Sequence, residues 1–222
     1  MNENEVVWPT GMSDQDPAAR DRPLVFNPQG FLVATERLTL RPAREDDAEP
    51  TWRFRRQESV GRWLTAVPHS LEDYRAMFEE PDRLATTLIV ERDGEVIGDL
   101  MLKIEDAWAQ TEVAPRARGV QAELGWVLDP AHAGHGYETE AVRGLLRLCF
   151  DELDLRRVVA RCFSDNEVSW RLMERLGMRR ELHAVRESLD RSGEWLDVYG
   201  YAMLASERPI GLGLRRTATR SA

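Results

Sequence analysis

A glycine-containing turn between a β-prone run and a helical pattern is the segment of this sequence best suited to hold an anion. The turn carries Gly134 and Gly136 within the stretch Leu128–Ala141. The first N–H groups of a helix have no partners inside it, and together with the helix dipole they attract a phosphate or a diphosphate. Glycine has no side chain to block such a group. A tight turn that binds no ligand would show the same pattern, so the two glycines alone do not distinguish an anion site from an ordinary turn.

Runs of strand and helix character alternate along the chain and give this turn its place. The predicted strands are 32–41, 86–91, 95–104, 121–128, 157–163, 178–189 and 195–204, and the predicted helices are 44–57, 70–80, 137–152 and 166–176. Asp93 and Gly94 indicate a hairpin, Ser70 indicates a helix start, and Gly177 indicates a helix end. This order favours an α/β (α+β) fold in which helices cover both faces of a mixed sheet of about seven strands.

Length and composition indicate one globular domain with two extensions. The chain has 222 residues, of which 42% are hydrophobic and 31% charged. We expect flexible arms at 1–30 and 208–222 around a domain of residues 31–207. No apolar run approaches the ~20 residues that cross a bilayer, and the acidic N-terminus does not resemble a signal peptide. With only Cys149 and Cys162 and no disulfide framework, we expect a cytoplasmic protein that has no membrane partner.

Charge and histidine spacing narrow the choice of partners. A net charge of −9 argues against nucleic acid and is compatible with a cationic substrate, although it also serves solubility alone. The four histidines show no metal-ligand spacing, so we predict no metal. They are His69, His132, His135 and His183.

Two separated motifs resemble those of the GNAT superfamily of N-acetyltransferases. Residues Ala133–Glu138 are similar to the family's acetyl-CoA signature, Gln/Arg-x-x-Gly-x-Gly/Ala. Residues Asn166–Met178 are similar to its next motif, in which Asn-x-x-Ser/Ala is followed by Leu-Gly-Phe/Met. The runs Thr35–Pro42 and Gly193–Leu204 resemble the RimJ/RimL-like branch, which acetylates the N-termini of ribosomal proteins. The resemblance spans about 31–207 and implies the GNAT fold, with a mostly antiparallel sheet.

The resemblance also implies a reaction and a partner. Acetyl-CoA would be the cosubstrate, and its acetyl group would pass directly to a primary amine, either a protein N-terminus or a small molecule. The pantetheine arm would lie between splayed strands at 123–128 and 157–163. Relatives often form homodimers, and the terminal hairpin offers an edge for one. The residues implied in acetyl-CoA binding are Val127, Leu128, Ala133, Gly134, His135, Gly136, Tyr137, Glu138, Thr139 and Asn166; at His135 the backbone matters.

Two side chains are implied in catalysis. Glu123 matches a strand glutamate that acts as general base in some branches, although an ordinary exposed glutamate is the alternative. Ser169 matches a serine proposed as the acid for the leaving thiolate; the alternative is a small residue that makes room for pantetheine. Other branches use a tyrosine where this chain has Met173, which cannot donate a proton. Asn166 would cap its helix and could also bond the pantetheine amides.

The sequence departs from the family pattern at two positions. Ala133 stands where Gln or Arg is usual, and Glu138 stands where Gly or Ala is usual. Glu138 would either repel the diphosphate or point to solvent and support the helix start. These departures leave open a non-catalytic acyl-CoA-binding or regulatory module. A nucleotide-binding protein is a weaker alternative, because the chain lacks Gly-Lys-Ser/Thr. The tryptophans expected near an acceptor cleft are Trp52, Trp63, Trp108 and Trp126.

Overall fold

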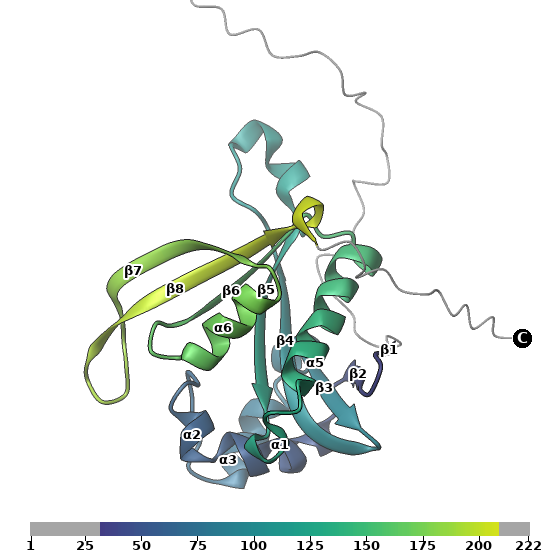
Figure 1. Cartoon of the computed structure of the whole chain (residues 1–222), viewed down its shortest axis with the longest axis vertical. Helices are drawn as coiled ribbons and strands as arrows, with labels where there is room; N and C mark the ends of the chain where they lie inside the picture. Colours follow the sequence, from purple (N-terminus) through teal and green to yellow (C-terminus); the bar gives the residue numbers. More distant parts are fainter. Residues whose placement is uncertain (1–31, 209–222) are drawn as a thin grey trace, which may run out of the picture.

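The computed structural model describes residues 32–208, which form one eight-stranded sheet with helices on both faces (Figure 1). The strand order is β1-β2-β3-β4-β5-β6-β8-β7, and the pair β5–β6 alone is parallel. The strands are β1 (Val33–Ala34), β2 (Thr39–Pro42), β3 (Thr87–Arg92), β4 (Glu95–Glu105), β5 (Gln121–Leu128), β6 (Arg157–Phe163), β7 (Arg179–Leu189) and β8 (Trp195–Leu204). The α-helices are α1 (Ala48–Arg55), α2 (Glu58–Gly61), α3 (Leu71–Phe78), α4 (Pro81–Thr86), α5 (Tyr137–Arg147) and α6 (Glu167–Arg175). Shorter turns are η2 (Glu45–Asp47), η3 (Thr111–Ala117), η4 (Pro130–His132), the π-helical η5 (Leu148–Glu152) and η6 (Ala205–Glu207).

The mixed sheet with helices on both faces is confirmed, with one more strand than predicted. The expected first strand, 32–41, is divided by a turn that the Thr35 N–H and hydroxyl close on the Leu38 carbonyl, at 2.9 and 3.1 Å. The hairpin at Asp93 and Gly94 is confirmed, with φ angles of 52° and 82°. The predicted flexible arms lie outside the described residues, except for Arg208.

Two hydrophobic clusters hold the layers together. The larger cluster packs α5 and α6 against one face of the sheet, with Leu124 and Leu145 at its centre. The smaller cluster packs α1 and α3 against the other face, where Tyr74 and Phe78 contact Ile89. Within residues 32–208, no helix is long and apolar enough to span a membrane.

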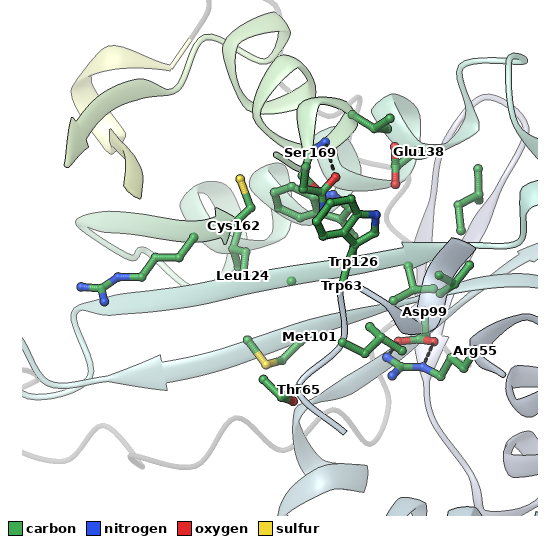
Figure 2. A pocket seen from close by; sticks show the side chains of 18 of the residues that line it. Arg55, Trp63, Thr65, Asp99, Met101, Leu124, Trp126, Glu138, Cys162 and Ser169 are labelled. Atoms are coloured by element: carbon green, nitrogen blue, oxygen red, sulfur yellow. Dashed lines mark hydrogen bonds and ion pairs between the residues drawn. The ribbon is translucent and has the colours of Figure 1, made fainter. Parts of the chain in front are cut away.

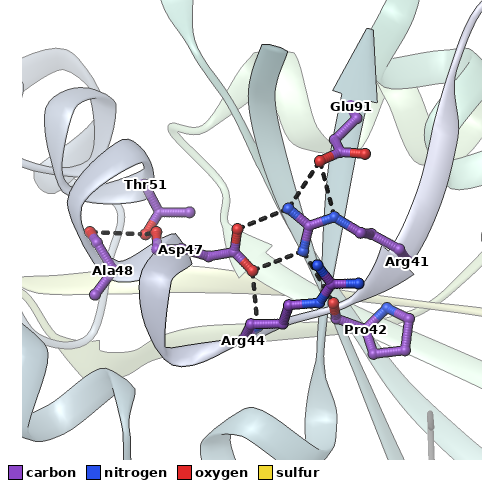
Figure 3. Close-up of polar contacts among 7 residues, drawn as sticks. All are labelled: Arg41, Pro42, Arg44, Asp47, Ala48, Thr51 and Glu91. Atoms are coloured by element: carbon purple, nitrogen blue, oxygen red, sulfur yellow. Dashed lines mark hydrogen bonds and ion pairs between the residues drawn. The ribbon is translucent and has the colours of Figure 1, made fainter. Parts of the chain in front are cut away.

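A buried ion pair joins β2 to the helical layer (Figure 3). Two guanidinium nitrogens of Arg41 donate to the two carboxylate oxygens of Asp47, each at 2.7 Å, and its Nε donates to Glu91 at 2.8 Å. The Arg44 N–H also donates to Asp47, at 2.7 Å. These hydrogen bonds, foremost that to Asp47, raise the pKa of Arg41. The pair therefore fixes where α1 begins, and α1 forms one wall of the cleft described below.

We predict that Asp47→Ala lowers the free energy of unfolding by about 1–3 kcal/mol, because the buried Arg41 guanidinium loses two charge-assisted hydrogen bonds and keeps Glu91 as its carboxylate partner. Urea denaturation followed by circular dichroism measures this loss. Glu49→Ala is the matched control, since it breaks an ion pair with Arg75 whose side chains are 53% and 49% exposed, and such pairs contribute about 0–1 kcal/mol. Equal losses in the two variants would contradict the structural role of Asp47.

Candidate functional site

A cleft of about 1100 Å³ opens where the ends of β5 and β6 meet the starts of α5 and α6 (Figure 2). Parts of α1, α2 and α4 and the adjoining ends of β3 and β4 form its other wall. All the predicted site residues except His135 line this cleft: Glu123, Val127, Leu128, Ala133, Gly134, Gly136, Tyr137, Glu138, Thr139, Asn166 and Ser169. The fold therefore gathers residues that are far apart in the sequence around one cavity.

The cleft exists because β5 and β6 separate. They pair only over Gln121–Glu123 and Arg157–Val159. Beyond that point β5 stays bonded to β4 as far as Leu128, and β6 stays bonded to β8 as far as Phe163. Among the described strands, none pairs with the facing edges of these two ends. Main-chain N–H and C=O groups on those edges are thus available to an extended ligand.

The start of α5 presents unpaired N–H groups to the same cleft. The helix's first internal hydrogen bond runs from Glu140 N to Gly136 O at 3.0 Å, so the N–H groups of 137–139 have no partner within the helix. Gly134 and Gly136 have φ angles of 80° and 78°, a left-handed conformation that favours glycine. Such a turn at a helix start binds anions well.

A tether from the β1–β2 turn holds this helix start in place. The Glu140 carboxylate accepts hydrogen bonds from the Thr35 hydroxyl at 2.6 Å and from the Arg37 N–H and Nε, each at 2.7 Å. The Arg37 guanidinium also donates to the His135 carbonyl at 3.1 Å and lies over the Tyr137 ring. Burial acts to raise the pKa of Glu140, but these hydrogen bonds outweigh it and keep the pKa below its ordinary value.

Glu138 points into the cleft rather than into bulk solvent (Figure 2). Its side chain is half-buried, and burial raises its pKa to about 7, although the charge of Arg175 opposes the rise. Arg175 lines the same part of the cleft, and its guanidinium donates to the Thr139 hydroxyl at 3.1 Å. Arg175 of α6 therefore brings a cation to the start of α5 in a chain that has Ala133 where Gln or Arg is usual.

The predicted catalytic and capping residues lie on different walls. Glu123 is half-buried on β5 and lies directly opposite Lys103 on β4. Ser169 lies in the first turn of α6, where its N–H donates to the Asn166 side chain at 3.3 Å. Asn166 is thus a helix cap, as predicted. His135 turns its ring away, with Nδ1 2.9 Å from the Ala133 carbonyl.

The four tryptophans expected near the cleft divide into three groups. Trp63 and Trp126 line it. Trp52 instead stacks on Tyr74 in the smaller cluster, with ring centroids 5.2 Å apart. Trp108 is 89% exposed and is not among the residues that line the cleft.

The two cysteines have different surroundings. Cys149 is fully buried in the larger cluster, and burial strongly raises the pKa of its thiol. Cys162 lines the cleft, and burial raises the pKa of its thiol to about 11. Neither environment favours a thiolate. In the part of the chain that the structure describes, no three His, Cys, Asp or Glu side chains are grouped to hold a metal ion.

Several residues of the site escaped the sequence analysis. Arg37 and Glu140 are 103 positions apart, so the sequence did not indicate that they form an ion pair. Arg55 on α1 makes a two-pronged ion pair with Asp99 on β4, at 2.8 and 2.6 Å, within the cleft (Figure 2). The sequence carried no signal for this pair.

Comparisons with known proteins bear on the identity of the site. A family model described as an acetyltransferase (GNAT) domain matches residues 37–179. The uncharacterized N-acetyltransferase YnaD of Bacillus subtilis (strain 168) is 28% identical over 176 residues, which cover 79% of this chain and 98% of YnaD.

Solved structures share the fold. RimJ of Mycobacterium smegmatis, in complex with CoA-disulfide, has a TM-score of 0.66 at 24% identity, covering 81% of this chain and 90% of RimJ. RimL, the ribosomal L7/L12 alpha-N-protein acetyltransferase, has a TM-score of 0.66 at 21% identity, covering 78% of this chain and 94% of RimL. With the family model matched over most of its folded part, this chain belongs to the GNAT acetyltransferase family and is an acyltransferase.

Proposed function

We propose that this enzyme transfers the acetyl group of acetyl-CoA to a primary amine, either a protein N-terminus or a small molecule, within a ternary complex. The observation that carries the proposal is the alignment of two features in one cleft. The unpaired N–H groups at the start of α5 suit a diphosphate, and the gap between β5 and β6 suits an extended pantetheine arm.

The start of α5 would hold the diphosphate through main-chain N–H groups and one cation. The N–H groups of Tyr137 to Thr139 would donate to the phosphate oxygens, and Arg175 would supply the positive charge. Pantetheine would then run along the open edge of β5, whose N–H groups near Val127 and Leu128 would meet the thioester carbonyl. Hydrogen bonds aimed at that oxygen would stabilise the negative charge that develops during transfer.

The chemistry needs one base and one acid. A neutral amine attacks the thioester carbonyl, a tetrahedral oxyanion forms, and CoA leaves as a thiolate that must be protonated. Glu123 would take the proton from the amine, because it faces the cleft from the strand beside the gap. Ser169 would protonate the sulfur from the start of α6, where the buried Met173 cannot.

We predict that CoA binds more tightly as the pH falls through about 7, because protonation removes the Glu138 charge that faces the diphosphate. In Glu138→Gln this part of the pH dependence should vanish, and the Kd at pH 8 should fall roughly tenfold. Isothermal titration of wild type and variant at pH 6 and pH 8 measures both effects. The phosphate monoester of CoA also titrates at about pH 6. This titration affects the Kd of wild type and variant to the same extent, so the comparison between them removes it. Equal Kd values at pH 8 would refute the repulsion.

We predict that Glu123→Gln lowers kcat by at least about a hundredfold, because a positioned base contributes 10²–10⁴-fold. Thiol release from acetyl-CoA over a panel of primary amines measures the rate. Glu105→Gln is the matched control, a β4 glutamate outside the cleft. A loss below tenfold would remove the base role, and CoA binding without turnover of any amine would favour a non-catalytic module.

A further inference from the structure

The wall of the cleft formed by α1 and α4 carries an arginine whose charge is not balanced. Arg83 of α4 lines the cleft. Its Nε is buried, and within residues 32–208 this atom has no hydrogen-bond partner and the side chain makes no ion pair. A buried donor without a partner costs free energy, so an arginine placed in this way suits a bond to something that enters the cleft.

The neighbouring charges do not supply that partner. Asp99 is buried and already holds Arg55 through two hydrogen bonds of 2.8 and 2.6 Å. Both Arg55 and Arg83 lie close enough to the Tyr74 hydroxyl for their charges to oppose the rise that burial gives its pKa. Asp99 is therefore paired with Arg55 alone, and among the described residues Arg83 has no carboxylate partner on this wall.

Arg83 is held at a fixed place on the sheet. The carbonyl of Arg83 accepts hydrogen bonds from the hydroxyls of Thr87 at 2.7 Å and Thr86 at 3.3 Å. Thr87 opens β3, lies opposite Met101 on β4, and Met101 lies opposite Gly125 on β5. Directly paired residues share a face of the sheet, and so do residues two apart in one strand. Arg83 thus lies at the same face as Glu123, and Thr87 beside it is two strand spacings across and two residues along from Glu123, or about 12 Å.

The part of the cleft between Arg83 and Glu123 is largely apolar. Met101 lies between Thr87 and Gly125 in the sheet and lines the cleft, and Gly125 adds no side chain. An aliphatic or peptide spacer fits such a surface, with its amine near Glu123 and an anion near Arg83.

We propose that the acceptor amine of this enzyme carries a carboxylate, which Arg83 binds while the amine lies near Glu123. A guanidinium offers a carboxylate two parallel hydrogen bonds, which fixes the orientation of the acceptor as well as its affinity. The inference rests on the proposed acetyl transfer and adds the class of acceptor. Its carboxylate could belong to a free amino acid or to an acidic side chain behind a peptide N-terminus.

Two isosteric pairs of amines test the proposal with the full chain and acetyl-CoA. One pair is 6-aminohexanoate and 6-aminohexanamide, and the other is the C-terminally amidated peptides Ser-Asp-Ala and Ser-Asn-Ala. In at least one pair, kcat/KM for the carboxylate should exceed that for the amide by about tenfold or more, since hydrogen bonds to charged groups are the strong ones. The pair that shows the preference identifies the source of the carboxylate.

Variants of Arg83 then test whether this residue causes the preference for the carboxylate. In Arg83→Met the ratio of the two kcat/KM values should fall towards one, and Arg83→Lys should retain part of it. Arg56→Met is the matched control, an exposed arginine at the end of α1 that should keep the ratio. Unchanged CoA affinity shows that each variant is folded. Equal turnover of both members of each pair by wild type, or an unchanged ratio in Arg83→Met, overturns this inference alone. Turnover of none of the four amines contradicts the proposed function as well.

Discussion

The N–H groups that the first turn of α5 leaves without partners are the feature on which the proposed chemistry depends. No side chain could replace them, because they combine fixed direction with the positive end of the helix dipole. Their position is set from outside the cleft. Glu140 ties the helix to Thr35 and Arg37, and left-handed glycines let the chain turn directly from β5 into α5.

The separation of β5 from β6 is the second feature on which the proposed chemistry depends. Because β5 and β6 part after Glu123 and Val159, an extended ligand that enters from the α5 start can follow the free edge of β5. That edge leads to the face where α1 and α4 form the opposite wall. The buried Arg41–Asp47 pair, which lies outside the cleft, joins the start of α1 to β2. In the proposed complex, the diphosphate, the thioester and the acceptor would thus follow one another along a single cavity.

Local patterns in the sequence predicted much of this arrangement. Gly134, Gly136 and the Asn166 cap act through neighbouring backbone, and the structure places all three where the sequence analysis expected them. Contacts between distant segments could not be predicted in this way. The charge at Arg175 meets α5 only after α6 has packed, and the lack of a carboxylate partner for Arg83 within residues 32–208 emerges only once Asp99 is found bonded to Arg55.

The role of the α5 start is tested most directly by comparing pantetheine with derivatives that carry phosphate. Isothermal titration of the full chain with CoA and with pantetheine, which lacks the diphosphate and the nucleotide, should be paired with a titration of 4′-phosphopantetheine and of dephospho-CoA. If the unpaired N–H groups hold the diphosphate, 4′-phosphopantetheine, which differs from pantetheine by one phosphate only, should bind at least about tenfold more tightly than pantetheine, since charge-assisted hydrogen bonds to that phosphate separate them. Equal affinity for these two ligands would contradict the account.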